Sequence, residues 1–196
     1  MSRKYLSVGK DEIREDSFYG VMDTDKLKPN GGLWLTQHVS EDFNSWVDCI
    51  LYDEDLRYLW FKDRTRKNFF EQPCCAVSLI HKAHLYVLHN DQSFDYLMKC
   101  FSSNGDFFSY ENLSKFYDGI YVSLSGYLYH DYKEIVSKMR SEFVEDSLLL
   151  FNLDCINYYQ SGKVCIPPFD YECGERPGSY EIKLDNTRKR VLKKGE

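Results

Sequence analysis

Residues 28–32 read Lys-Pro-Asn-Gly-Gly and give the strongest turn signal in the chain. Proline fixes φ near its turn value and glycine adopts positive φ without steric cost, so this run reverses the chain direction. The β-prone sequence Leu-Trp-Leu-Thr follows at once at residues 33–36. A turn that opens directly into such a run predicts a strand that starts just after Gly32.

Four further segments predict strands. Residues 5–9 are short, β-prone and closed by a glycine, and residues 84–88 are typical of a buried strand. In residues 120–124 the apolar Ile, Val and Leu alternate with more polar neighbours, which indicates a half-buried strand. Residues 147–152 form an apolar run short enough to be a central strand.

Apolar residues spaced by three and four positions predict three helices. The first follows Ser40, an N-cap candidate, and the second follows Asp91 or Ser93, which are alternative caps. A shorter helix is expected around residues 111–116. The apolar positions of the three periodic helices are Phe43, Trp46, Val47, Ile50 and Leu51; Phe94, Leu97, Met98 and Phe101; and Tyr132, Ile135, Val136 and Met139.

The chain has 196 residues, the length of one domain with a sizeable core. Strands and short helices occur without regular strand–helix–strand alternation, which predicts an α+β fold. The turn-rich residues 167–178 close the compact region. We therefore expect a single α+β domain over residues 1–180, followed by a basic C-terminal tail over residues 181–196.

The net charge of −6 is unevenly distributed along the chain. Residues 183–196 hold six basic and two acidic residues, so residues 1–182 carry −10. An acidic body argues against broad binding of a phosphate backbone, because that affinity comes from clustered Lys and Arg. The tail is expected to be solvated or frayed, with contact to nucleic acid as the alternative.

The cysteines and histidines indicate which cellular compartment the chain suits and whether it has a metal site. The chain has seven cysteines and no apolar run long enough to cross a bilayer, and its first eight residues have too few apolar residues for us to expect a signal peptide. We expect a cytoplasmic protein with buried thiols and no disulfides. His81, His84 and His89 lie near Cys74 and Cys75 but lack the spacing of a zinc site, so no metal is expected.

Four segments occur in an order that carries a resemblance. They are residues 27–36 (Leu-Lys-Pro-Asn-Gly-Gly-Leu-Trp-Leu-Thr), Trp46 on the next predicted helix, residues 117–120 (Tyr-Asp-Gly-Ile) and residues 145–156, which begin Glu-Asp-Ser. The ordered set resembles a group of small phage and bacterial proteins. Its last two segments also look like the closing strands of the ADP-ribosyltransferase fold. The resemblance implies two small packed antiparallel sheets with peripheral helices and a cleft between them.

The resemblance implies an NAD site with a carboxylate near the ribose. Breaking the nicotinamide–ribose bond of NAD develops an oxocarbenium, which a carboxylate stabilises. Asp146 and Glu145 are the catalytic candidates, and at most one of them enters a given pocket because adjacent strand residues face opposite ways. Asp146 is preferred, since it aligns with the acid that precedes Ser147 in the resembling group. Leu153 stands where the closing phrase usually has proline.

Aromatic and hydroxyl groups complete the expected site. Trp34 is the expected stacking wall for the nicotinamide ring and Thr36 a donor for its amide, while Tyr5 and Ser7 grip the ribose. Tyr117 is a further candidate for NAD binding. The implied activity is transfer of ADP-ribose from NAD to a protein or nucleic-acid acceptor.

Several of these residues also have a purely structural interpretation. Trp34 and Trp46 both suit core packing, and Trp46 lies on the apolar stripe of its helix. Asp118 suits a turn in which it caps backbone amides and Gly119 takes a positive φ, and Asp146 suits a solvated connection. The alternative function is a non-catalytic phage or mobile-element protein that inhibits or binds a host protein. It would use the same groove or its acidic surface, including mimicry of nucleic acid.

Overall fold

The computed structural model describes residues 4–24, 28–40, 43–52, 70–102, 108–123, 146–167 and 179–195. These residues form an α+β fold built on one nine-stranded sheet in the order β5-β6-β7-β2-β1-β4-β8-β9, with β3 paired to β2 outside this path. The strands are β1 (Lys4–Val8), β2 (Leu33–Ser40), β3 (Phe43–Asn44), β4 (Phe70–Leu79), β5 (Leu85–Leu88), β6 (Gly119–Val122), β7 (Ser147–Leu150), β8 (Ile156–Ile166) and β9 (Glu181–Leu184). The helices are α1 (Ser45–Tyr52), α3 (Asp91–Phe101) and α4 (Tyr110–Leu113), with a 3-10 turn at Glu15–Ser17.

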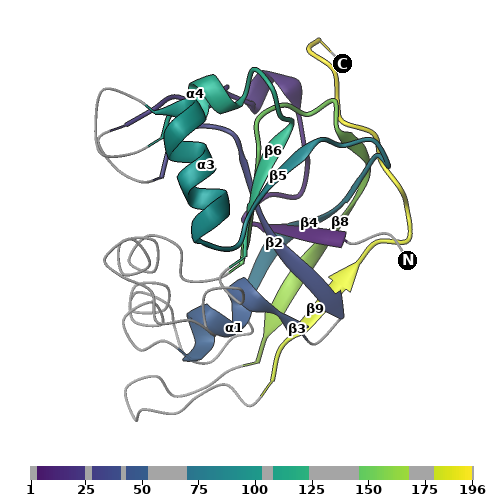
Figure 1. Ribbon diagram of the computed structural model, residues 1–196. Coiled ribbons are helices and arrows are strands. Elements are labelled where there is room, and N and C mark those ends of the chain that lie inside the picture. Colours follow the sequence, from purple (N-terminus) through teal and green to yellow (C-terminus); the bar gives the residue numbers. More distant parts are fainter. Residues whose placement is uncertain are drawn as a thin grey trace.

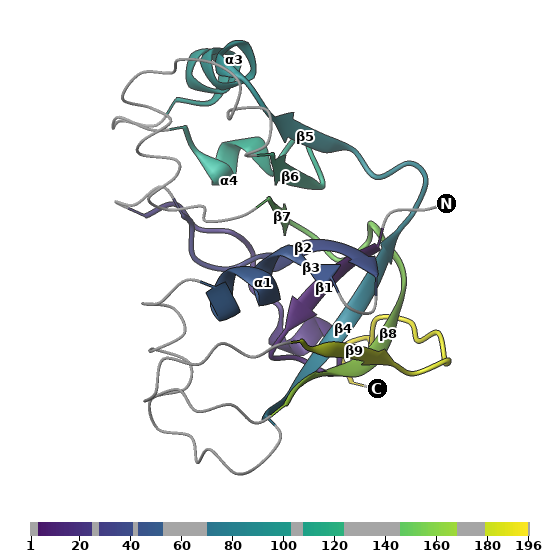
Figure 2. The same cartoon turned by 90° about the horizontal axis from the view of Figure 1, so that it is seen from below.

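The expectation of two separate packed sheets is wrong for the part of the chain that the structure describes. Strand β2 pairs with β1 on one side and with β7 on the other, so it joins what would be two sheets into one. All strand pairs are antiparallel except β5 with β6. Figures 1 and 2 show α3 and α4 beside β5 and β6, and α1 beside β2.

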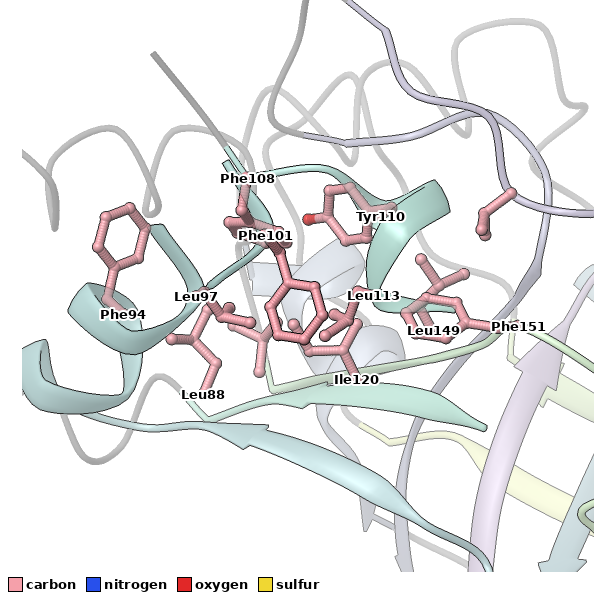
Figure 3. Close-up of a cluster of buried hydrophobic side chains, with 12 residues drawn as sticks. Leu88, Phe94, Leu97, Phe101, Phe108, Tyr110, Leu113, Ile120, Leu149 and Phe151 are labelled. Carbon is pink, nitrogen blue, oxygen red and sulfur yellow. The ribbon is translucent and has the colours of Figure 1, made fainter. Parts of the chain in front are cut away.

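The α-helices cover one face of the sheet, which we call the helical face. Residues paired across strands share a face, and Leu6, Trp34, Leu149 and Ile120 lie on this one. One cluster packs α3 and α4 on the sheet (Figure 3), and another packs α1 on β1, β4, β8 and β9. The helical face therefore carries two separate hydrophobic cores, one over β5, β6 and β7 and one over β1, β4, β8 and β9, with β2 between them.

The opposite face, which we call the loop face, has its own core. Tyr5, Leu35, Leu148 and Tyr159 lie on this face and are buried. They are covered by Ile13 of the N-terminal segment, by residues 153–156 and by the C-terminal segment. Each face thus buries a different half of every central strand, as alternation requires.

The predicted turn forms as the proline and glycines indicate. Gly31 and Gly32 have φ values of +79° and +70°, and Gly32 donates its N–H to the Tyr19 carbonyl at 2.8 Å. Strand β2 begins directly afterwards, which confirms the expected strand. Strands β1 and β7 are confirmed too, and β7 is central because it lies between β6 and β2.

The first helix begins later than its apolar spacing predicts. Residues Phe43–Asn44 form β3, paired with β2 at His38 and Ser40, so α1 starts at Ser45 and Ser40 is a strand residue. Sheet pairing overrides the helical pattern there. The helix predicted from Tyr132 to Met139 lies outside the described residues.

Three predictions for the segments around α3 differ from the structure. Asn90 caps the helix instead of Asp91 or Ser93, and Ser93 completes the reciprocal capping box. Strand β5 lies at an edge of the sheet with Val87 exposed, so it is not fully buried. Gly119 has no positive φ; a Cβ there would lie 2.6 Å from the Leu149 carbonyl oxygen, so close strand packing explains this glycine.

The segment expected as a solvated basic tail belongs to the fold through residue 195. Strand β9 pairs with β8, and beyond it Lys189 pairs with Tyr159 and Leu192 with Arg14. The apolar residues Ile182 and Val191, interspersed among the cations, pack into the cores and hold the segment in place. Among the described residues, no helix combines the length and apolar character needed to traverse a membrane.

Candidate functional site

A pocket of about 290 Å³ lies on the helical face between the two helix-covered cores. Its walls come from β1, β2, β7 and α1, together with Lys28 from the turn before β2. Trp34, which packs against the α3–α4 core, and Trp46, which packs against the α1 core, both line it. The pocket therefore occupies the gap between two cores and not the interior of either.

Strand register explains which side chains enter this pocket. Thr36 is paired with Leu6 on β1 and with Ser147 on β7, so the three lie in one row across the sheet. All three line the pocket, as does Trp34 two residues before Thr36. Ser147 thus lies at the pocket with Trp34, at a place where the resemblance implies a carboxylate from Asp146 or Glu145.

The pocket combines two indole rings, two hydroxyl groups and one cation. The Lys28 Nζ lies 5.7 Å from the centroid of the Trp34 ring, within range of a cation–π contact. The Thr36 hydroxyl donates a long hydrogen bond of 3.4 Å to the Leu6 carbonyl. Indole faces suit a flat ring and an ammonium suits a carboxylate or phosphate, so the lining fits an aromatic ligand that carries negative charge.

Asp146 lies on the other side of the sheet from this pocket. Its Oδ2 accepts a hydrogen bond of 2.9 Å from the Tyr121 hydroxyl and a weaker contact of 3.5 Å from the Ser123 hydroxyl. Tyr121 is paired with Leu148, which places it on the loop face. Alternation along β7 separates Asp146 from Ser147 in the same way. Glu145, the other catalytic candidate, lies outside the described residues.

Tyr5 and Ser7 also face away from the pocket. They alternate along β1 with Leu6 and Val8, which line it, so both lie on the loop face and both are buried. The Tyr5 ring meets the Tyr121 ring edge to face with centroids 6.3 Å apart. The structure therefore brings Tyr5 toward Tyr121, the residue that binds Asp146, and separates both Tyr5 and Ser7 from Trp34.

Tyr117 and Asp118 lie in the turn between α4 and β6, beside His84, which directly precedes β5. The Tyr117 ring stacks obliquely on His84 with centroids 4.5 Å apart and meets Tyr86 edge to face at 5.3 Å. The Asp118 carboxylate accepts from the His84 N–H at 2.8 Å and from the Asn152 amide at 2.9 Å. Asp118 thus has the turn-capping role, and Tyr117 does not line the Trp34 pocket.

A larger pocket of about 350 Å³ lies at the edge formed by β4, β8 and β9. Its charged residues pair with neighbours: Glu71 with Lys163 at 2.6 Å and Glu181 with Lys183 at 3.0 Å. Because these exposed charges are already paired with one another, they attract a charged ligand only weakly. The smaller pocket, with two tryptophans that lie between cores, is the stronger candidate.

The described residues contain no cluster of metal-ligating side chains, and most of their thiols are buried. No group of three or more His, Cys, Asp or Glu side chains is arranged to hold a metal ion within those ranges. Six cysteines are described as free thiols, and all but Cys100 are buried. Burial raises the pKa of Cys74, Cys75 and Cys155 to about 12, because the thiolate loses hydration.

Six pocket residues were not among the predicted ligand-binding residues, and the three of them that carry a polar or aromatic group are Lys28, Trp46 and Ser147. Lys28 adjoins the turn that positions Trp34, so the motif already contained it. Ser147 would have been found by applying strand alternation from Thr36 across the sheet, which requires the register. Trp46 was assigned to the core by its helical stripe, and it both packs there and lines the pocket.

Comparisons of the chain with protein-family models, with curated protein sequences and with solved structures give no match.

Proposed function

We propose that the chain binds NAD in the Trp34 pocket and transfers its ADP-ribose to a macromolecule, the activity that the resemblance to ADP-ribosyltransferases implies. The observation that carries the proposal is the row Leu6–Thr36–Ser147, which brings Ser147 of the late segment to the same pocket as the glycine-preceded Trp34. The resemblance implies a carboxylate of this late segment near Trp34, and the two segments are more than 100 residues apart in the sequence.

The proposed reaction breaks the bond between the nicotinamide nitrogen and the ribose carbon. Nicotinamide leaves with the bonding electron pair and becomes neutral, an acceptor nucleophile bonds to the ribose carbon, and the acceptor loses its proton. Trp34 and Trp46 would enclose the nicotinamide ring, and Lys28 would attract a phosphate. The pocket volume is at the lower end of ligand sites, about 300–1,000 Å³, so it suits the nicotinamide half of NAD better than the whole dinucleotide.

Glu145 and Asp146 are the two adjacent candidates for the carboxylate that stabilises the oxocarbenium. Asp146 is bonded to Tyr121 on the loop face, whereas Ser147 lines the pocket. Asp146 is thereby assigned a positioning role, holding the start of β7 against β6, and Glu145 becomes the first carboxylate to test as the group that stabilises the oxocarbenium.

Nicotinamide release from NAD tests the proposal. The wild type is expected to release nicotinamide, Glu145→Gln to lower the rate by about 100-fold or more, and Asp146→Asn to lower it less. Asp95→Asn is the matched control, because Asp95 is exposed on α3, and it should keep the wild-type rate. A wild-type chain that releases no nicotinamide in the presence of protein and nucleic-acid acceptors would refute transfer.

Thermal unfolding measures NAD binding independently of turnover. At about 100-fold above its dissociation constant, NAD would add about 2.7 kcal/mol to the free energy of unfolding. A chain of this size should then gain several degrees in Tm, and Trp34→Ala should remove the gain. An unchanged Tm at saturating NAD would refute the site.

The alternative function, a non-catalytic interaction protein, is favoured by one surface. Tyr96 on α3 and Phe116 in the turn after α4 are 48% and 65% exposed, and both rings meet the Phe101 ring edge to face. Exposed aromatic side chains are typical of protein interfaces. If NAD has no effect, and Phe116→Ser weakens a host-protein complex that Asp95→Asn leaves intact, the interaction protein is the better description.

A further inference from the structure

The C-terminal segment presents cations on a fixed backbone. Residues 186–195 contain five basic residues and no acid. Lys189 and Tyr159 exchange backbone hydrogen bonds of 2.8 and 2.9 Å, and the Leu192 N–H donates to the Ile13 carbonyl at 3.0 Å. The charges are therefore held beside β8, where their geometry is defined.

These cations divide between the two faces of the sheet. The Lys189 Nζ donates to the Ser161 hydroxyl at 2.8 Å, and Ser161 is paired with Cys75 on the loop face. Val191 packs into the loop-face core as well. Alternation then directs Arg188 and Arg190 toward the helical face.

Arg188 and Arg190 have no carboxylate within ion-pair distance among the described residues. The Arg188 guanidinium instead lies 4.6 Å above the centroid of the Tyr158 ring, and both arginines are exposed. Lys193, by contrast, forms an ion pair with Glu15 at 2.5 Å. Two arginines are thus available to an anion from solution.

These arginines share a face with the Trp34 pocket. Tyr158 is paired with Ser78, and Ser78 with Lys4, so the three form a row across the helical face. The next row runs across the sheet from Gln160 to Leu6, which lines the pocket. The Lys4 Nζ donates a hydrogen bond of 2.9 Å to Gln160 Oε1 and so links the two rows. From Leu6 to Tyr158 the path crosses two strand spacings and two residues, about 12 Å at standard sheet dimensions.

We propose that Arg188, Arg190, Tyr158 and Lys4 form a basic strip that binds single-stranded nucleic acid and leads it to the pocket. The strip offers guanidinium forks for phosphates and a Tyr–Arg stack as a platform for a base. Two to three cations suit a short single strand, whereas a duplex footprint commonly needs about 6–10 phosphate contacts. That this strand is the ADP-ribose acceptor rests on the function proposed above.

Fluorescence anisotropy with labelled single-stranded DNA and RNA of about 20 nucleotides tests the strip without NAD. The double variant Arg188→Ala/Arg190→Ala is expected to weaken binding about tenfold or more at about 50 mM salt, and to reduce the slope of log K against log salt by about 1.4. The matched control is Lys82→Ala/Lys99→Ala, which removes the same charge from exposed positions elsewhere. The control should bind as the wild type does.

Each outcome decides the inference. Equal binding by the two double variants, or no binding by the wild type at about 50 mM salt, overturns it. Competition by polyglutamate as effective as that by unlabelled oligonucleotide also overturns it, because the strip would then recognise acidic protein. Circular dichroism of each variant must show the wild-type fold. Oligonucleotide binding without nicotinamide release supports the basic strip and refutes the proposed transfer. Nicotinamide release without oligonucleotide binding refutes only the basic strip.

Discussion

At the scale of single residues, burial decides which thiols can react. Cys100 is exposed, whereas Cys74, Cys75 and Cys155 are buried with pKa values raised to about 12. Alkylation requires the thiolate, so these three should be inert at neutral pH. We expect a maleimide to label Cys100 in the native protein and the buried three only after unfolding, as read by peptide mass spectrometry. Native labelling of Cys74 or Cys75 at the rate of Cys100 would contradict the buried core.

Glycine at position 32 is required for two separate reasons. Its φ is +70°, and a Cβ there would lie 2.9 Å from the Leu150 carbonyl oxygen and also overlap the Leu149 side chain. Gly9 has a φ of +94° but open space around it. We expect Gly9→Ala to cost about 1 kcal/mol from φ alone and Gly32→Ala about 3 kcal/mol, because overpacking adds to the strain. Urea unfolding measures both, and equal losses would show that the turn has no tight packing.

At the scale of elements, α3 depends on a cap that its apolar pattern did not identify. Asn90 accepts a hydrogen bond from the Ser93 N–H at 2.8 Å, and the Ser93 hydroxyl contacts the Asn90 backbone N–H at 3.1 Å. Asn90→Ala should lower the free energy of unfolding by about 1 kcal/mol. Gln92→Ala, on an exposed residue of the same turn, should change it by less than about 0.5 kcal/mol. Chemical denaturation measures the loss of unfolding free energy in both variants. Similar losses would show that the capping box does not stabilise α3.

At the scale of the whole molecule, the two ends of the chain are joined by an ion pair. A hydrogen bond from Lys193 and another from the Lys194 N–H lower the pKa of Glu15 from its ordinary 4.5. A carboxylate with a depressed folded pKa stabilises the fold above its unfolded pKa, and this contribution is lost as the pH falls through the folded pKa. Lys193→Ala should therefore lower Tm at neutral pH, and its difference from the wild type should shrink below pH 4.5.

The control for this ion pair is Lys82→Ala, since Lys82 is exposed in the turn between β4 and β5, away from Glu15 in the sequence. Its small effect on Tm should not vary with pH in the same way. If the Lys193→Ala difference in Tm is as large well below pH 4.5 as at neutral pH, the C-terminal segment is held by apolar packing of residues such as Val191 and not by charge.

Local sequence determined most of the elements, and the family resemblance identified part of the site. The Pro-Gly-Gly turn, β1, β2, β7 and the apolar stripe of α3 follow from φ preferences and side-chain periodicity, which act within a few residues. Trp34 and Thr36 became pocket candidates through the family resemblance and not through these local signals. The local signals missed β3, because pairing with β2 overrides a helical pattern. They also missed the long strands β4 and β8 and the pairing of residues 181–184 and Lys189 with β8, because these depend on distant strands.

Only the tertiary structure decided which face of the sheet each candidate occupies. Asp146 and Ser147 are neighbours in sequence, yet one contacts Tyr121 on the loop face and the other lines the Trp34 pocket. Tyr5 and Ser7 are separated from Leu6 in the same way. A shift of one residue in strand register would exchange these faces, and register is fixed by packing between segments more than 100 residues apart. The sequence by itself determined that these residues lie in strands, and the assembled sheet determined what they face.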